Sequence, residues 1–229
     1  MHRTKDLLRT FFLFACVFFS IAQSQRSDAE LQRSAIYQRS TDARSRLNVL
    51  SVSIEPGQED LATLAYFRMA KGAKILSAYV TNGEGGENEG WAENPLSLAV
   101  TRRNEAIQAL ALVDGNVHFL NLPDVVAAPD SASVQSRWPV DTLDARLKKL
   151  ILEYHPDIVL LARDGASATS VRWKLFRESL IRTVKKIVPP QPSGKNRRAS
   201  SSGGWVVGRV WVESSAGTGV SVPDRKSVV

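Results

Sequence analysis

Cysteine and histidine are scarce in this chain of 229 residues, which holds one cysteine and three histidines. The lone Cys16 cannot form a disulfide within the chain, and a single thiolate does not make a structural zinc site. Cys16 also lies in an apolar N-terminal stretch that we expect to be removed. His118 falls within a predicted strand and His155 just before another, and we interpret both as core or surface residues rather than metal ligands.

A basic stripe with interleaved aromatic residues is also lacking, although the formal net charge is +7. The positive surplus is scattered, and much of it lies near residues 195–198. A nucleic-acid interface is expected to concentrate its basic residues on one face. We therefore interpret the charge as a determinant of solubility and predict no nucleic-acid partner.

The most apolar stretch, residues 10–21 (TFFLFACVFFSI), is short for a helix that spans a bilayer. It follows a positively charged start that contains Arg3, Lys5 and Arg9, and small residues suitable for cleavage lie within 20–24. This order is typical of a signal peptide. We predict that residues 1–22 are a signal peptide and that the protein is exported to the periplasm or the extracellular space.

Short apolar runs alternate with segments of helical periodicity along most of the chain. Such alternation predicts the α/β class with a mainly parallel sheet. The periodicity of residues 96–113 predicts an apolar face with Leu98, Ile107, Leu110 and Leu112, whereas 125–139 is predicted to be a loop. The predicted strands span 47–54, 73–81, 116–122, 157–162 and 205–213, and the predicted helices span 58–70, 96–113, 141–154 (capped by Asp141 or Thr142) and 170–187.

Both ends of the predicted domain, residues 47–216, differ from it in composition. Residues 23–46 are polar and charged, and we expect an extended or weakly helical leader. Residues 217–229 have no periodicity and are expected to be an unstructured tail. The last six residues, DRKSVV, look like a translated sequencing adapter, so we expect the natural protein to continue beyond about Pro223.

Polar, acidic loops follow the first two predicted strands, at residues 55–60 and 82–88. The carboxyl ends of parallel strands meet at one edge of a sheet, which is where open α/β sheets bind ligands. The glycines at 83–86 are expected to form one wall of this crevice. Trp91 and Trp138 lie in predicted loops on the same edge, where each can stack on a sugar ring or pack the loops.

Three motifs occur in order along the chain: TNGEGGEN at 81–88, RRNE at 102–105 and NLPD at 121–124. With the elements between them, they resemble the PIG-L/LmbE-like N-acetylglucosaminyl deacetylases, a family of zinc hydrolases. The resemblance implies a Rossmann-like three-layer α/β/α sandwich and an N-acetylated sugar or glycoconjugate as ligand. It also implies substrate-binding roles for Asn82, Glu84, Arg102 and Asp124.

The departures from the family pattern fall on its chemistry. Where the family has His-Pro-Asp-Asp-Glu after strand one, this chain has EPGQE. Glu55 therefore replaces the first zinc-ligand histidine, Gly57 the general-base aspartate and Gln58 the ligand aspartate, and only Glu59 is retained. The family's His-x-x-His element should fall within 164–172, where the nearest equivalents are Ser167 and Ser170.

These replacements predict a degenerate member of the family with no catalytic residues and no bound zinc, acting as a carbohydrate-binding or interaction module. The alternative is an active deacetylase or hydrolase with a metal site rebuilt from Glu55, Gln58, Glu59 and Asp164. We favour a simpler interpretation for the carboxylates near this edge, namely that they are solvated loop acids. They belong to Glu55, Glu59, Asp60, Glu84, Glu87 and Asp164. Arg102 has an alternative as well, a helix-surface ion pair with Glu105. The oligomeric state is not predicted.

Overall fold

A computed structural model of the chain describes residues 30–85, 94–125, 129–161, 170–187, 207–212 and 220–221. Residues 30–44, within the predicted leader, form a helix that belongs to a compact unit of its own, and Ser45 begins the second unit. Among the described helices, none combines the length and the apolar character that crossing a membrane requires. The predicted signal peptide, Cys16 included, lies outside the described residues.

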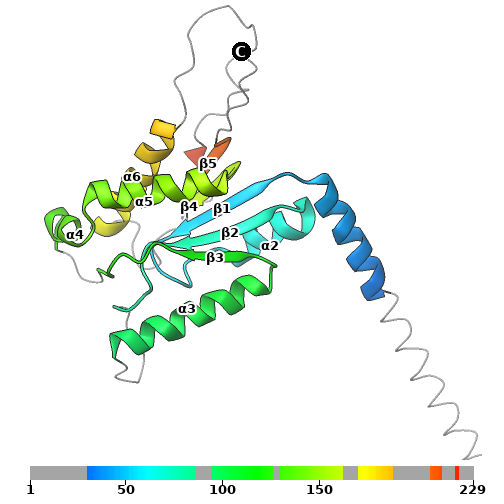
Figure 1. Cartoon of the computed structure of the whole chain (residues 1–229), viewed down its shortest axis with the longest axis horizontal. Coiled ribbons are helices and arrows are strands. Elements are labelled where there is room, and N and C mark those ends of the chain that lie inside the picture. The colour runs from blue at the N-terminus through cyan, green and yellow to red at the C-terminus, as the bar shows by residue number, and fades with distance from the viewer. Residues whose placement is uncertain are drawn as a thin grey trace, which may run out of the picture. The chain divides into compact units, whose positions relative to one another are not determined.

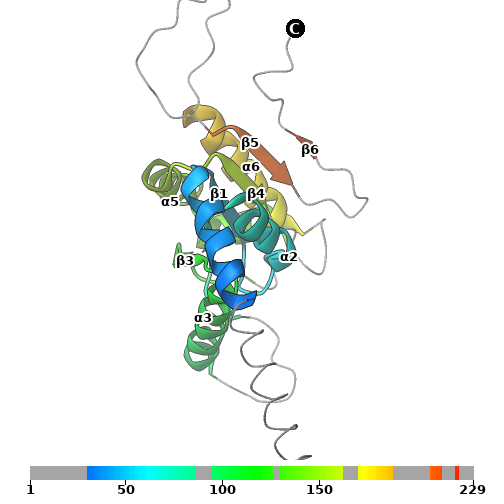
Figure 2. The same cartoon turned by 90° about the vertical axis from the view of Figure 1, so that its right-hand side faces the viewer.

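The second unit is built on a six-stranded sheet with strand order β3-β2-β1-β4-β5-β6 (Figures 1 and 2). Strands β1 to β5 pair in parallel, and β6 pairs antiparallel with β5. The α/β class and the mainly parallel sheet are thereby confirmed. The strands are β1 (Asn48–Ser53), β2 (Lys74–Tyr79), β3 (Asn116–Phe119), β4 (Ile158–Leu161), β5 (Arg209–Val212) and β6 (Val220–Ser221).

Strand β1 lies at the centre of this order, because the chain proceeds to β2 and β3 on one side and then returns to place β4 on the other. The direction of winding switches between β1 and β4, and the edge beyond their carboxyl ends is the usual ligand site of such sheets. The described residues at this edge, called the crevice below, belong to the loops after β1, β2 and β3 and to the start of the helix that follows β4.

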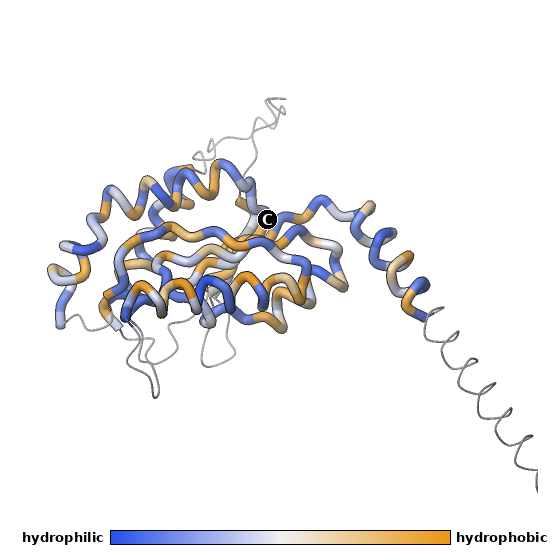
Figure 3. Tube along the Cα trace, turned by 60° about the horizontal axis from the view of Figure 1, so that its bottom comes forward, coloured by the Kyte–Doolittle hydropathy of each residue, from blue (hydrophilic) through white to orange (hydrophobic). Residues whose placement is uncertain are grey.

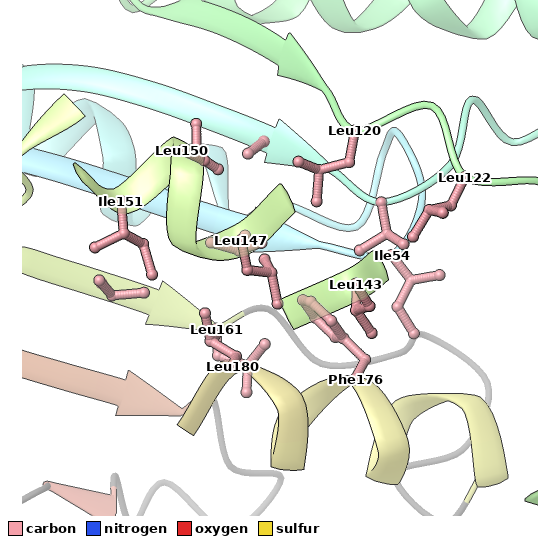
Figure 4. Packing of buried hydrophobic residues seen from close by; sticks show 14 of the residues in the cluster. Ile54, Leu120, Leu122, Leu143, Leu147, Leu150, Ile151, Leu161, Phe176 and Leu180 are labelled. Carbon is pink, nitrogen blue, oxygen red and sulfur yellow. The ribbon is translucent and has the colours of Figure 1, made fainter. Parts of the chain in front are cut away.

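Helices cover both faces of the sheet, which gives three layers (Figure 1). On one face, α4 (Ser131–Arg137), α5 (Val140–Tyr154) and α6 (Val171–Ile187) contribute apolar side chains to the larger core. Figure 4 shows Leu143 and Leu147 of α5 and Phe176 and Leu180 of α6 gathered against Leu161 of β4. Burial of strands on both faces explains why they are short apolar runs in the sequence and are among the more apolar segments in Figure 3.

The other face of the sheet packs against α2 (Leu61–Ala65), the π-helix η1 (Tyr66–Ala70) and α3 (Pro95–Ala111). The sequence predicted one α-helix over 58–70, but η1 has a wider turn that changes which residues face the core. Phe67 is buried, whereas Met69, expected on the inner face, is 51% exposed. Leu98 and Leu110 of α3 are buried as predicted, but Ile107 and Leu112 are exposed, so that half of the predicted face is wrong.

Three other expectations are corrected by the structure. The predicted loop 125–139 contains α4, whose N-cap Asp130 accepts a hydrogen bond from the Ser133 amide. Helix α5 is capped by Pro139, not by Asp141 or Thr142. In the tail predicted to be unstructured, Val220–Ser221 form β6. The first two errors share a cause. The prolines at 129 and 139 favour a loop over 125–139, but in the structure they flank the short helix α4, and Pro139 is the N-cap of α5.

Asp144 of α5 ties this helix to α6 through a bidentate ion pair. Its oxygens lie 2.8 and 2.9 Å from Nη2 and Nε of Arg182, and the Ser179 hydroxyl also donates to it. The hydrogen bonds from Arg182 are the main cause that lowers the pKa of Asp144 from 3.8 to about 2, although partial burial opposes them. The paired carboxylate therefore stabilises the fold above its ordinary pKa, and this stabilisation is lost as the pH falls toward 2.

Replacing Asp144 with asparagine is expected to lower the free energy of unfolding by about 1 kcal/mol at pH 7, a modest value because the ion pair is partly exposed. The difference between the variant and the wild type should shrink as the pH falls from about 4 to 2, where the wild-type carboxylate becomes protonated. Urea denaturation at pH 7, 4 and 2 measures both values. A difference that stays constant over these pH values would contradict the assignment.

Candidate functional site

The loop after β1 is held by hydrogen bonds from its own backbone. The amide oxygen of Gln58 accepts from the Ile54 and Glu55 amides, at 3.1 Å each. Glu59 accepts from the amide of Gly57, whose φ of 87° is a left-handed conformation that glycine adopts without strain. Asp60 caps α2 by accepting from the amides of Ala62 and Thr63. The polar side chains at 58–60 thus stabilise the turn that presents Glu55.

Glu55 is a buried acid held between two arginines. Its Oε1 lies 2.5 Å from Nη1 of Arg172, at the start of α6, and its Oε2 lies 3.7 Å from Nη1 of Arg102, on α3. Only 10% of the Glu55 side chain is exposed. A carboxylate at this depth requires a cationic partner, and the two guanidinium groups supply it from opposite faces of the sheet.

Gly83 allows Arg102 to reach this position. A Cβ on Gly83 would lie 2.7 Å from Cδ of Arg102, and the backbone φ of 73° also favours glycine. The predicted glycine wall is therefore present at Gly83, where it packs against an arginine side chain. Gly86, Glu87 and Trp91 lie outside the described residues.

The loops after β2 and β3 are joined by two carboxylates. Glu84 accepts from the amides of Asn82 and Asp124, at 3.2 and 2.9 Å. Asp124 in turn accepts from the Gly85 amide at 3.1 Å and lies 3.4 Å from Nη1 of Arg172. Burial raises the pKa of Asp124, against the opposing hydrogen bonds from Gly85 and Val125 and the charge of Arg172. Both acids have partners that fix the shape of the crevice.

A second arginine of α3 organises the outer rim. Arg103 donates to the amide oxygens of Asn82 and Asn121, at 2.7 and 3.0 Å, and lies 4.0 Å above the Phe119 ring. Asn121 has a left-handed φ of 53°, which asparagine tolerates better than most residues. The amide group of Asn82 thus stands at the rim of the crevice with its oxygen oriented by Arg103.

The structure brings most of the predicted site residues together at one edge of the sheet. Ser170 caps α6 two residues before Arg172, with its hydroxyl 3.2 Å from the Trp173 amide. Ser167 and Asp164 lie outside the described residues. The side chains that converge on the crevice come from the loops after β1, β2 and β3, from the middle of α3 and from the start of α6: Glu55, Gln58, Asn82, Glu84, Arg102, Asp124 and Arg172.

One predicted feature, the location of Trp138, differs in the structure. Trp138, considered for stacking on a sugar ring, is fully buried, and its indole donates to the Pro123 carbonyl at 2.7 Å. That use is therefore wrong for Trp138. The histidines agree with their interpretation, since His118 is exposed on β3 and His155 is exposed at the end of α5, before the amino end of β4.

Among the described residues, those at the crevice do not fit a zinc ion of the kind found in hydrolases. Such a site needs three protein ligands and an open position for water. Glu55 is engaged by two arginines, the Gln58 oxygen faces the backbone, and Gly57 has no side chain. Within the described ranges, no group of three histidine, cysteine, aspartate or glutamate residues could hold a metal ion.

Arg172 is the site residue that sequence reasoning missed. The chain has 30 lysines and arginines, and none of the motifs distinguishes this one. A signal was nevertheless present: a glutamate directly after a central strand requires a cation if it is buried. Arg102 was predicted to be a site residue or to pair with Glu105 on the helix surface. In the structure it lies in the crevice and forms an ion pair with Glu55.

Comparisons with known proteins agree with this architecture. The model of the GlcNAc-PI de-N-acetylase (PIG-L) family matches residues 60–169. GalB, the 4-carboxy-2-hydroxymuconate hydratase of Pseudomonas putida KT2440, has a similar structure, with a TM-score of 0.52 and 18% identity over 72% of this chain and 65% of its own. The N,N'-diacetylchitobiose deacetylase of Pyrococcus horikoshii gives a TM-score of 0.48 and 20% identity over 72% and 59%.

The conserved protein TT1542 of Thermus thermophilus gives a TM-score of 0.48 and 19% identity over 72% of this chain and 65% of its own. The chain therefore spans about three fifths to two thirds of the length of these structures. None of the curated proteins matches it. At these identities the similarity concerns the fold alone, so the reaction has to be argued from the site. The chain therefore matches the PIG-L family over residues 60–169, the part that carries three of the motifs at the crevice.

Proposed function

We propose that this chain is a non-catalytic member of the PIG-L family and binds an N-acetylated sugar or glycoconjugate in the crevice. The observation that carries the proposal is the state of Glu55, which replaces the family's first zinc-ligand histidine. Its carboxylate is 2.5 Å from Arg172 and 3.7 Å from Arg102, and it is buried with them. A carboxylate bound this way by two guanidinium groups is not available to a metal ion.

The neighbouring residues support the same conclusion. Gly57 and Gln58, at the family's general-base and ligand positions, supply no base, and the Gln58 oxygen caps the loop. The family match begins at Asp60, immediately after these residues. What remains in the crevice are amide, carboxylate and guanidinium groups, which suit hydrogen bonding to the hydroxyl and acetamido groups of a sugar.

Metal analysis and two assays on the purified protein test this proposal. After growth with added zinc, we expect substoichiometric metal and no acetate released from N-acetylglucosamine or N,N'-diacetylchitobiose. Saturation-transfer NMR should show binding of these sugars that EDTA does not change. Stoichiometric zinc with turnover would instead establish the rebuilt hydrolase with Glu55, Gln58, Glu59 and Asp164. Absence of saturable binding would leave an interaction module without a sugar ligand.

Export is part of the proposal. It rests on the charged start and the apolar run of residues 1–22, which precede the domain in the order that signal peptides have. Expression of the full chain followed by N-terminal sequencing of the exported product is expected to give a start within 21–25. An uncleaved product retained in the cell would contradict it.

Restoring one histidine is not expected to restore activity. The variant Glu55→His should release no more acetate than the wild type, because Gly57 and Gln58 still lack the base and the second ligand. The imidazole would also stand beside the guanidinium groups of Arg102 and Arg172, which disfavour a metal cation. An acetate-release assay with zinc in the buffer measures this. Turnover by this single variant would refute the positions assigned to Gly57 and Gln58.

A further inference from the structure

One nitrogen of Arg172 is surrounded by oxygens in the manner of a bound cation. Its Nη1 lies 2.5 Å from Oε1 of Glu55, 3.4 Å from Oδ1 of Asp124 and 3.3 Å from the carbonyl oxygen of Val125. These atoms come from the loops after β1 and β3, which are not adjacent in the sheet. The guanidinium therefore links two loops that strand pairing does not hold together.

The oxygens around this nitrogen are buried and fixed by the backbone. The Asp124 side chain is 1% exposed, the Glu55 side chain 10%, and that of Arg172 itself 15%. Asp124 is oriented by the amides of Gly85 and Val125, and the Glu55 amide is bound by Gln58. Two carboxylates this close and this deep repel each other unless a positive charge lies between them.

We propose that the Arg172 guanidinium is the resident cation of the crevice, which takes the place of a metal ion in holding the loops after β1 and β3 together. Arg172 is therefore a positioning residue, because it holds Glu55 and Asp124 in place. The proposal predicts that removing its charge leaves an oxygen-lined cavity, formed by Glu55, Asp124 and the Val125 carbonyl, that takes up a divalent cation. Carboxylate and carbonyl oxygens suit Ca²⁺.

The inference rests on the proposed function in one respect, since both take the wild-type crevice to lack a metal ion. The two can fail separately. Stoichiometric zinc in the wild-type protein would remove the proposed function, whereas the test below compares variants by stability and does not involve a sugar or turnover.

The test is calcium rescue of the variant Arg172→Met, which keeps much of the aliphatic part of the side chain. We expect Arg172→Met to have a clearly lower Tm than the wild type, and millimolar CaCl₂ to restore several degrees of it, because a ligand that binds only the folded state stabilises that state. CaCl₂ should leave the wild-type Tm unchanged. Calorimetric titration should show saturable calcium binding by the variant alone.

Two controls separate a cation site from a general effect of losing an arginine. Arg182→Met removes another guanidinium of the same helix, but its partner Asp144 is a single carboxylate with Lys186 3.5 Å away. Calcium should therefore not rescue Arg182→Met. The double variant Glu55→Gln with Arg172→Met removes one of the two carboxylates, so it should be more stable than Arg172→Met alone and bind no calcium.

Three results would overturn the proposal: a wild-type Tm for Arg172→Met, no response of that variant to calcium, or equal rescue of Arg182→Met. If Arg172→Met does not fold even with calcium, the double variant decides the question. A folded double variant supports the account, because the defect is then the uncompensated charge. A double variant that is also unfolded overturns it.

Discussion

Replacing Trp138 with alanine is expected to lower the free energy of unfolding by about 3–5 kcal/mol, within the range for large aromatic residues in a core. The side chain is fully buried in the larger core, where it packs with residues of α4, α5 and α6. Its indole also donates to the Pro123 carbonyl at 2.7 Å, so that the substitution leaves this carbonyl oxygen without its donor. Both losses act in the same direction.

Guanidinium denaturation followed by circular dichroism measures this loss. Trp138→Phe is the informative companion, because it keeps most of the apolar volume and removes the indole donor, and it should cost less than alanine. Leu112→Ala is the matched surface control, since Leu112 is 78% exposed and its loss should change stability little. A cost for Trp138→Ala as small as that of the surface control would mean that the residue is not a core residue.

Trp138 also shows where sequence reasoning about the site failed. Its neighbours are small and polar and include two prolines, which is the composition of a loop. Burial depends on residues far away in the sequence, here the helices that close over the carboxyl end of β3. Local composition carries no information about them. The loop after β3 is thus fixed to the core by its Pro123 carbonyl, immediately before Asp124 reaches the crevice.

Most of the fold, by contrast, could be predicted. Strands buried on both faces are short continuous apolar runs, whereas amphipathic helices repeat apolar residues every three to four positions. As a result, the strands β1, β2 and β4 and the helix α6 lie within a few residues of their predicted bounds. The edge at which polar loops meet follows from parallel pairing alone. The carboxyl ends of β1, β2 and β3 do carry the predicted acids.

The pairing of charges across that edge could not be predicted from local patterns. Glu55, Asp124, Arg102 and Arg172 come from four separate segments, and each of them alone is a plausible surface residue. Their burial, and the choice of partner for each, is decided by how α3 and the start of α6 meet the sheet. The family resemblance predicts replaced side chains at Glu55 and Gln58, and the structure shows which contacts these two residues make.

Two arginine–carboxylate pairs have the same nitrogen–oxygen distance, but their carboxylates differ in burial. Arg172 to Glu55 and Arg68 to Asp114 both measure 2.5 Å between nitrogen and oxygen. The Glu55 side chain is 10% exposed, whereas that of Asp114 is 80% exposed. Isosteric removal of the charge, by Glu55→Gln and Asp114→Asn, therefore compares a buried and an exposed carboxylate at equal ion-pair distance.

We expect Glu55→Gln to lower the free energy of unfolding by about 3 kcal/mol, because it leaves the largely buried guanidinium groups of Arg172 and Arg102, 15% and 24% exposed, without their shared carboxylate. Asp114→Asn should cost less than about 1 kcal/mol, since water solvates the 80% exposed carboxylate and asparagine tolerates the left-handed φ of 49° at this position. Denaturation of both variants at low and high salt measures the contrast, and salt should weaken the effect at Asp114 more. Equal costs for the two substitutions would mean that Glu55 is solvated, and the assignment of Arg172 as its buried cation would then be untenable.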